Sequence, residues 1–439
     1  MSAARLTLLA GAALGLTALA ACGGPPPGDP HRQIGPNPYL PDIHQYLMPP
    51  MKVPKTEPWG SAVPTVAPGL QIKALAQNLK NPRSLYVLPN GDVLVAETDG
   101  PPGPVNRPKE FVMNWIEKQA HSKTKAAQRI LLIRDPGNGA PPQTTVFIDH
   151  LTSPFGMVLV GSDFYVADTD AVLRFPYQTG DTQITAPPQK LTDLPGGPID
   201  HHWTKSLTAS PDGTKLYAGV GSNSNITENG MPAELDRAQI WEIDRTTGAH
   251  RPYATGLRNP NGLTFEPTTH VLWAVVNERD ELGPDLVPDY MTSVKDGAFY
   301  GWPYSYYGQH VDPRVKPQKP EMVAKAIPPD YALSSHVAPL GMVFYTGDAL
   351  PVAYHGGAFV AEHGSWNRPQ LNGYRVVYIP FADGRPNGMA QDVVTGFVGA
   401  DGKAKGRPVT VAVDGKGALL IADDVGNTVW RVTAAGAPP

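Results

Sequence analysis

Cysteine is almost absent from this chain, and charged residues are few. Cys22 is the only cysteine among 439 residues, so the chain has no internal disulfide and no Cys-x-x-Cys-His site for covalent haem. Only 17% of the residues are charged and the formal net charge is −4, which gives no overall attraction for nucleic acid or an anionic membrane. We therefore expect a small-molecule partner, and any basic site has to be local.

The longest apolar segment is short and lies at the N-terminus. Arg5 precedes an apolar run from Leu6 to Ala20, which is too short to span a bilayer comfortably and ends at Leu19-Ala20-Ala21-Cys22. These residues resemble a bacterial lipoprotein signal with its lipobox, which implies that the thiol of Cys22 carries the lipid. An ordinary secretory signal is the alternative. Both predict export, and the first predicts a lipid-anchored protein at the periplasmic or extracellular face of the cell envelope.

Proline and glycine, by contrast, are abundant, with 49 and 45 residues, and 41% of the residues are hydrophobic. This composition favours an all-β protein with a large core and many turns. Six times a Pro- or Gly-marked turn leads into an apolar strand, a second turn and another apolar strand. The six units span residues 81–97, 153–168, 202–220, 258–276, 339–362 and 407–423. Their starts lie about 50 to 80 residues apart, which predicts a six-bladed β-propeller with four-stranded antiparallel blades.

This pattern divides the chain into three parts. Residues 1–22 are predicted to be a lipoprotein signal peptide, 23–68 a Pro/Gly-rich tether and wrap, and 69–434 the propeller. A longer insertion separates the first two units, and its stretch from Pro108 to Ala127 has the apolar spacing of a surface helix. A second excursion, Tyr304 to His336, is expected between the fourth and fifth blades as a wall of the pocket.

Three motifs, and their order along the chain, resemble one family. They are Gly256-Leu257-Arg258-Asn259-Pro260-Asn261-Gly262-Leu263, the later Tyr300-Gly301-Trp302-Pro303, and His202 ahead of a Pro211-Asp212-Gly213 turn. Over about Leu70 to Val432 the chain is similar to pyrroloquinoline-quinone-dependent sugar dehydrogenases, especially the sorbosone dehydrogenase-like branch and soluble glucose dehydrogenase. The resemblance implies a quinoprotein that oxidises the hydroxyl of an aldose or related sugar by hydride transfer to the quinone. It also implies an external electron acceptor.

A tricarboxylate quinone requires several cations in one pocket, and the planar fork of arginine suits carboxylates best. Arg258 and Arg407 each lie at the turn that opens a unit. The resemblance implies that Arg258 bonds the reactive quinone oxygen and that Asn259 orients the ring system. It also implies that Lys405 and Arg407 replace an Arg-x-Arg pair that holds cofactor carboxylates.

The stretch from Glu362 to Arg368 contains further candidates for the cofactor site. His363 stands where the glucose enzymes place a lysine near the cofactor. Trp366 and Arg368 are suited to stack on, or pair with, a planar anionic ring, although packing alone also accounts for Trp366.

Oxidation of a hydroxyl group also requires a proton acceptor, and histidine titrates near the working pH. His202 aligns with the general base of the family, and His201 is interpreted as a bystander. The glucose enzymes follow this blade with an Asp that polarises the histidine, whereas this chain has Ser222-Asn223. Ser153-Pro154-Phe155-Gly156 occupies the turn of a family glutamine, so we expect a substrate other than glucose.

The family also uses calcium as a Lewis acid beside the quinone. Its loop corresponds here to Asn277-Glu278-Arg279-Asp280-Glu281, in which Glu278, Arg279 and Asp280 are predicted to form the metal site and the two acidic side chains are the candidate ligands. The glucose enzymes use a Gly-Pro pair whose counterpart, Gly283-Pro284, comes slightly late. An exposed charged loop is the alternative interpretation.

Two other classes of function remain open. A calcium-dependent six-bladed lactonase-type hydrolase requires carboxylates around an axial ion and no cationic clamp, and Arg258 and Arg407 argue against it. A non-catalytic cell-surface propeller that only binds a partner is the other alternative. It is consistent with the loss of the Asp and of the glutamine.

Overall fold

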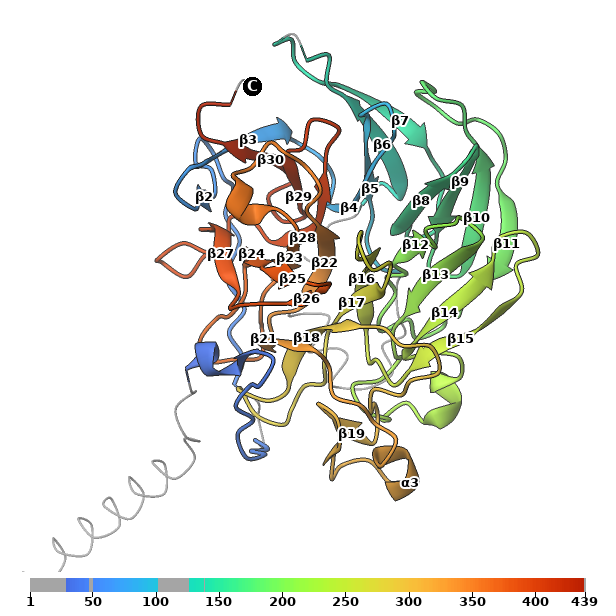
Figure 1. Cartoon of the computed structure of the whole chain (residues 1–439), viewed down its shortest axis with the longest axis vertical. Helices are drawn as coiled ribbons and strands as arrows, with labels where there is room; N and C mark the ends of the chain where they lie inside the picture. Colours follow the sequence, from blue (N-terminus) through green and yellow to red (C-terminus); the bar gives the residue numbers. More distant parts are fainter. Residues whose placement is uncertain (1–28, 47–49, 102–125, 138, 438–439) are drawn as a thin grey trace, which may run out of the picture.

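The computed structural model describes residues 29–46, 50–101, 126–137 and 139–437, and these residues form a six-bladed β-propeller (Figure 1). The first blade contains β4 (Pro82–Val87), β5 (Val93–Glu97), β6 (Arg129–Arg134) and β7 (Gln143–Ile148). The second contains β8 (Gly156–Val160), β9 (Asp163–Ala167), β10 (Ala171–Pro176) and β11 (Gln189–Asp193). The third contains β12 (Leu207–Ala209), β13 (Lys215–Val220), β14 (Gln239–Asp244) and β15 (His250–Thr255).

The other three blades follow the same antiparallel order. The fourth contains β16 (Pro260–Phe265), β17 (Leu272–Val276), β18 (Pro288–Ser293) and β21 (Tyr331–Ser335), and the fifth contains β22 (Pro339–Phe344), β23 (Ala358–Glu362), β24 (Arg375–Ile379) and β27 (Gln391–Thr395). The sixth joins β28 (Pro408–Val413), β29 (Leu419–Asp423) and β30 (Thr428–Ala434) to β3 (Leu70–Ala76). The innermost strands β4, β8, β12, β16, β22 and β28 contact one another in a closed ring, as Figure 1 shows.

Residues from the N-terminal part of the chain close the ring and extend two blades. Strand β3 pairs with β30, so the sixth blade combines three C-terminal strands with one early strand. The short strands β1 (Ile34–Gly35) and β2 (Thr65–Val66) add a fifth strand to the fourth and fifth blades. Trp59, between them, packs edge to face on Trp430 of β30 and joins the core of the last two blades.

The six predicted units are the two inner strands of each blade. In β5, β17, β23 and β29 all five residues are buried, because neighbouring blades cover both faces of these strands. Their sequences therefore read as continuous apolar runs rather than as alternating patterns. The outer strands are more polar, and none of the five residues of β11 is buried.

The two long excursions lie inside blades rather than between them, which corrects their predicted position. The first separates β5 from β6 within the first blade, because β6 pairs with β5. The helix predicted from Pro108 to Ala127 falls almost entirely outside the described residues. The second excursion ends in β21, which pairs with β18 and completes the fourth blade.

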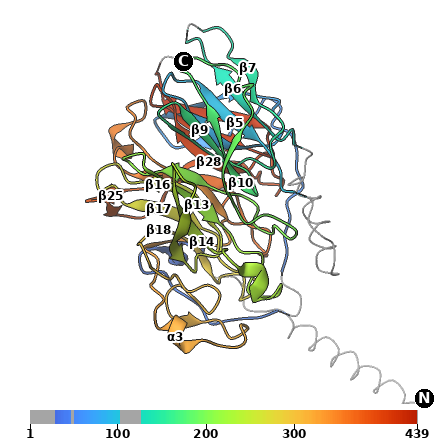
Figure 2. The ribbon, with the colours of Figure 1, turned by 90° about the vertical axis from the view of Figure 1, so that its right-hand side faces the viewer.

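The second excursion carries its own small elements, β19 (Ser305–Tyr306), β20 (His310–Val311) and α3 (Pro320–Val323). Figure 2 shows that α3 stands out from the blades at one end of the molecule. The remaining elements are the 3-10 helices η1 (Pro30–Gln33), η2 (Met231–Glu234) and η3 (Val352–Tyr354) and the hairpin of β25 (Phe381–Ala382) and β26 (Arg385–Pro386). None of the helices in the described ranges is long and apolar enough to cross a membrane.

Candidate functional site

The turns that open the six units gather at one end of the ring. In five blades the residue that begins the first strand pairs with the last residue of the second strand, as in Pro82 with Glu97 and Pro408 with Asp423, and in the third blade Leu207 pairs with Ala218, two residues before the end of β13. Since the first strands surround the axis, these turns place their side chains around a common axial end. The candidate residues His202, Arg258 and Arg407 all belong to such turns.

His202 is held by the loop that follows β13. Its Nδ1 lies 2.7 Å from the backbone carbonyl oxygen of Ser222 and 3.2 Å from the Ser222 hydroxyl. A carbonyl oxygen only accepts, so Nδ1 carries the proton and Nε2 is the unprotonated nitrogen of the neutral ring. Burial, with the charges of Arg258 and His201 nearby, holds the pKa of His202 well below its ordinary value. The ring is therefore neutral at pH 7 and able to accept a proton at Nε2.

Arg258 and Asn259 lie beside this histidine. A Cβ added to Gly221 would come within 2.4 Å of Asn259 Oδ1 and 2.5 Å of His202 Cβ, so both side chains pack against the bare backbone there. Arg258 is only 3% exposed and donates to the carbonyl oxygens of Asn225 at 3.1 Å and Glu278 at 2.7 Å. These bonds fix the guanidinium within the axial end.

A second group of charges joins the fifth and sixth blades to the first. Asp424 Oδ2 accepts from Arg83 NH1 at 2.6 Å and lies 2.9 Å from His363 Nε2. Arg407 donates to the carbonyl oxygens of His363 and Gly364, both at 3.0 Å. The structure thus brings together the two predicted residues His363 and Arg407 and adds two that were not predicted, Arg83 and Asp424.

The residues of the predicted calcium loop differ in their partners, and two of them, Glu278 and Arg279, pair with each other. Arg279 is fully buried, lies 3.0 Å from Glu278 Oε2, and donates to Asp312 and to the carbonyl oxygens of Pro303 and Ser305. A guanidinium has only donors and cannot bind a metal ion, so Arg279 anchors the second excursion, and Glu278 is its partner. This arrangement differs from the predicted metal site.

Asp280, in the same loop, has 23% of its side chain exposed. Its Oδ1 accepts from Asn367 at 2.6 Å, and its Oδ2 lies 3.4 Å from Arg258. Although burial raises the pKa of Asp280, the hydrogen bond with His336 and the charge of Arg258 lower it below its ordinary value. Among the residues with described positions, no three His, Cys, Asp or Glu side chains gather to hold a metal ion.

The Gly283-Pro284 carbonyls, which were compared with calcium ligands of the glucose enzymes, have other partners. His336 Nε2 lies 3.1 Å from the carbonyl oxygen of Gly283, and Arg368 donates to that of Pro284. Arg368 also pairs with Asp285 at 2.8 Å and is only 1% exposed. It therefore holds this loop in place instead of joining the Arg83 and Arg407 group.

Lys405 also lies apart from that group. Its Nζ is 3.8 Å from Glu57 of the N-terminal segment, and 29% of its side chain is exposed. Trp366 is half-buried, and its carbonyl oxygen accepts from the backbone of Lys52 in the same segment. The N-terminal segment thus passes over the axial end of the last blades.

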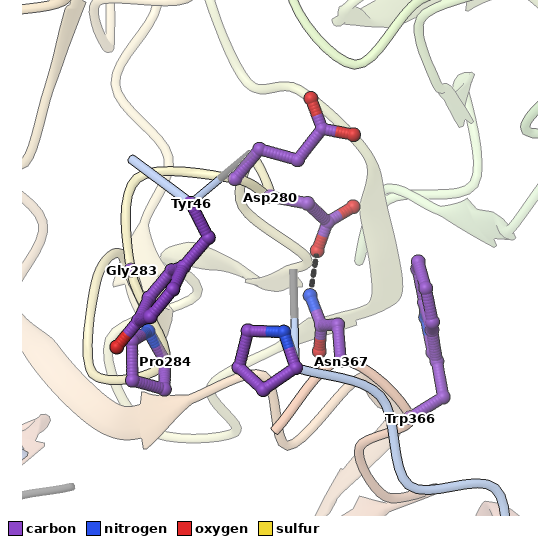
Figure 3. A pocket seen from close by; sticks show the side chains of 8 residues that line it. Tyr46, Asp280, Gly283, Pro284, Trp366 and Asn367 are labelled. Carbon is purple, nitrogen blue, oxygen red and sulfur yellow. Dashed lines mark hydrogen bonds between the residues drawn. The ribbon is translucent and has the colours of Figure 1, made fainter. Parts of the chain in front are cut away.

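A small pocket of about 30 Å³ opens between this segment and the axial loops. Its lining residues are Tyr46, Pro50, Asp280, Glu281, Gly283, Pro284, Trp366 and Asn367. Figure 3 shows the rings of Tyr46 and Trp366 on opposite sides, with the hydrogen-bonded pair of Asp280 and Asn367 between them. The volume suits about one water molecule, so a larger ligand at this point has to displace the segment or bind beside it.

Sequence reasoning missed Arg83 and Lys205, which are buried basic residues at this end of the ring. Arg83 follows Pro82 in the turn that opens the first unit, so the repeat itself was a signal for it. Lys205 is fully buried three residues after His202, and burial, followed by the charge of Arg237, lowers the pKa of Lys205 to about 7. No comparable signal in the sequence distinguishes it from a surface lysine.

The chain matches a known family over most of its length. The model of the TrAA12-like family matches residues 124–295 and 309–435 of the 439 residues. A protein of Borreliella burgdorferi that is named uncharacterized is 31% identical over 241 residues, which cover 54% of this chain and 62% of that protein. A pyrroloquinoline quinone-dependent pyranose dehydrogenase of Coprinopsis cinerea is 26% identical over 222 residues, which cover 41% of this chain and 30% of that enzyme.

A similar fold occurs among solved structures. The calcium structure of a Trichoderma reesei carbohydrate-active enzyme of family AA12 superposes with a TM-score of 0.67. It is 19% identical, and the match covers 85% of this chain and 97% of that one. At this identity the likeness concerns the propeller alone. The chain spans less than two thirds of the length of the Borreliella and Coprinopsis relatives.

Proposed function

Because the chain belongs to the TrAA12-like family, we propose that it is a quinoprotein that oxidises a hydroxyl group of an aldose or related sugar with bound pyrroloquinoline quinone. The observation that carries the proposal is the convergence, at one axial end, of His202, poised to accept a proton, with buried arginines from three blades. Electrons then pass to an external acceptor.

The charged groups at the axial end fit a planar anionic cofactor. Arg83 Nε and Asn259 Oδ1 are buried and have no hydrogen-bond partner within the described ranges, so a polar ligand would satisfy them. We propose that Arg83, His363 and Arg407 hold carboxylates of the cofactor, since guanidinium groups bind carboxylates through paired bonds. Arg258 would donate to a quinone oxygen, as the resemblance implies, and Asn259 would orient the ring system.

The bound quinone would supply the acceptor for the hydride that leaves the sugar carbon. His202 would take the hydroxyl proton at Nε2, because the Ser222 carbonyl oxygen keeps the other ring proton on Nδ1. The low pKa of the ring keeps it neutral before the substrate arrives. Gly221 allows His202 and Asn259 to lie close together, so the proton acceptor and the cofactor share one site.

Calcium as a Lewis acid remains part of the proposal through the family resemblance and the calcium-bound Trichoderma reesei relative. The residues of this chain fit the ion only in part. Asp280 is partly exposed, although its oxygens already contact Asn367 and Arg258, whereas Glu278 is buried against Arg279 and the carbonyl groups of Gly283 and Pro284 have partners of their own. We therefore assign no step to the ion, and Asp280 is the ligand that we propose.

The test is reconstitution of the purified protein with the quinone and calcium. We expect a protein-bound quinone absorbance after gel filtration, which an added aldose then bleaches. Arg83→Ala and Arg407→Ala should each weaken quinone binding about ten- to a hundredfold, because each loses charge-assisted bonds worth about 1.5–3 kcal/mol. Arg251→Ala is the matched control, because Arg251 lies on the outer strand β15 and its side chain is 47% exposed.

The same experiment separates the alternatives. Binding of quinone that no aldose or related sugar reduces would contradict a dehydrogenase. A protein that does not bind the quinone but hydrolyses lactones in the presence of calcium would be a hydrolase. A protein that does neither would be a surface binding module, and the proposal would then be wrong.

A further inference from the structure

Asp424 lies at the centre of the buried cation group at the axial end. One of its oxygens, Oδ2, is shared by Arg83 NH1 at 2.6 Å and His363 Nε2 at 2.9 Å. The other, Oδ1, is buried and has no hydrogen-bond partner in the part of the chain that the structure describes. The carboxylate thus holds two groups from different blades and retains one unused acceptor.

The bond to Asp424 determines where a second proton on His363 goes. Although burial raises the pKa of Asp424, His363 and Arg83 lower it to about 2, so the carboxylate is ionised and only accepts. Nε2 of His363 therefore carries the proton of the neutral ring. Any further proton has to bind Nδ1.

Together, the groups that face His363 carry too little positive charge to neutralise a multivalent anion. Arg83 and Arg407 are cations and Asp424 is an anion, while Tyr374 stays neutral because burial raises its pKa. Burial, and then the charge of Arg407, lowers the pKa of His363 to about 4, against the opposing effect of Asp424. With His363 neutral, the cluster carries one net positive charge, whereas a tricarboxylate ligand brings three negative charges.

From this arrangement, and resting on the proposed function, we propose that capture of the anionic quinone brings one proton onto Nδ1 of His363. Asp424 is the positioning residue that holds the resulting imidazolium and Arg83 toward the ligand. The incoming carboxylates oppose the effect of Arg407 and make the protonated ring the stable form. The resemblance aligns His363 with a lysine of the glucose enzymes, and this chain would instead create its cation on binding.

The sign of the pH dependence follows from linkage. The pKa of His363 is low in the empty cluster and higher in the complex, so one proton is taken up between the two values. Affinity should rise as the pH falls toward about 4, where the ring is already protonated in the empty cluster. It falls by up to about tenfold per pH unit as the pH rises between the two pKa values, and then becomes constant.

The experiment is calorimetric titration of the purified protein with pyrroloquinoline quinone at pH 5 to 8, at constant calcium, in buffers of different ionisation enthalpy. We expect uptake of about one proton per quinone in the middle of this range. His363→Gln retains an N–H donor for Asp424 but cannot titrate, so it should bind without proton uptake, with the weak affinity of the wild type at high pH. His355→Gln, at an exposed histidine, is the matched control and should retain the uptake.

Asp424→Asn tests the positioning role with the same readout. Loss of the carboxylate leaves two arginines uncompensated, so the cluster gains a positive charge and proton uptake should fall, which a purely structural role would not change. Quinone binding without proton uptake in the wild type, or unchanged uptake in His363→Gln, would overturn this inference and leave the proposed function standing. Failure to bind quinone at any pH would overturn both.

Discussion

The orientation of His202 depends on a backbone carbonyl group rather than on a carboxylate side chain. The Ser222 carbonyl oxygen fixes the tautomer, as a carboxylate would, but adds no negative charge that stabilises the imidazolium ion. The pKa of His202 consequently stays low, and the ring remains in the form that accepts a proton. His202 is therefore a weaker base, but its ring stays neutral and able to accept a proton at lower pH.

The first prediction concerns this residue. His202→Ala should retain quinone binding but lose about 10²–10⁴-fold in the rate of quinone reduction by an aldose or related sugar, because the positioned proton acceptor is gone. His201→Ala is the control and should reduce the quinone at nearly the wild-type rate. Single-turnover reduction followed by absorbance measures both. A His202→Ala protein with the wild-type rate would remove His202 from the mechanism.

The second prediction concerns pH. The reaction needs the neutral ring, so the wild-type rate should fall only when the pH drops well below 6.5. Ser222→Asp places a carboxylate near Nδ1, which raises the pKa of His202 and moves this acid limb to higher pH. Ser222→Ala keeps the carbonyl group and should leave the limb in place. Coincident profiles for Ser222→Asp and the wild type would contradict the role given to this position.

Local sequence patterns say where a side chain lies in a blade, but they do not identify a partner that lies far away in the chain. Arg258 and Arg407 lie in turns that open a blade, His363 follows β23 at the same end, and Arg83, which was not predicted, also occupies an opening turn. Arg368 and Lys405 also looked like cofactor residues. Their carboxylate neighbours, Asp285 and Glu57, come from distant segments that no local pattern connects to them.

The elements show the same contrast between local and distant information. The inner two strands of every blade are apolar because other blades cover both faces, so the sequence revealed all six pairs. The polar outer strands carry no such signal. For this reason the residues of β21 were predicted to lie within the second excursion. In the structure β21 follows most of that excursion and pairs with β18.

The second excursion, between β18 and β21, is attached to the ring through buried charged side chains. Asp312 has no exposed surface, pairs with Arg279 at 3.2 Å, and also accepts from Arg314. Arg279 in turn follows β17, beside the loop that contains Asp280. The ion pair thus connects the excursion with the axial end. The positions of both should depend on this ion pair.

The third prediction follows from that contact. Asp312→Asn should reduce the free energy of unfolding by about 1–3 kcal/mol, because the buried guanidinium of Arg279 loses one of its two carboxylates and keeps only Glu278. Thermal unfolding followed by circular dichroism measures the change. Asp193→Asn, with a side chain 79% exposed, is the matched control and should change little. Equal stability of the two variants would show that the ion pair does not hold the excursion.

At the scale of the whole molecule, cellular location remains a prediction, because Cys22 lies outside the described residues. Cys22→Ser should release the protein from the membrane fraction into the soluble fraction, since it removes the proposed lipid anchor. Fractionation with immunodetection measures the distribution, and metabolic labelling with a palmitate analogue detects the lipid. Continued membrane association of unlabelled Cys22→Ser protein would place the anchor elsewhere.

The pairing of β3 with β30 also determines when the molecule can be completed. During synthesis, Leu70–Ala76 emerges before five blades and has no partner until Thr428–Ala434 follows. Until Thr428–Ala434 has been synthesised, the unpaired edge of this strand is exposed to other nascent chains, which favours aggregation. We expect a strong dependence of folding on holding chaperones. A premature stop codon that removes only the last strand should be nearly as damaging as one that removes a whole blade.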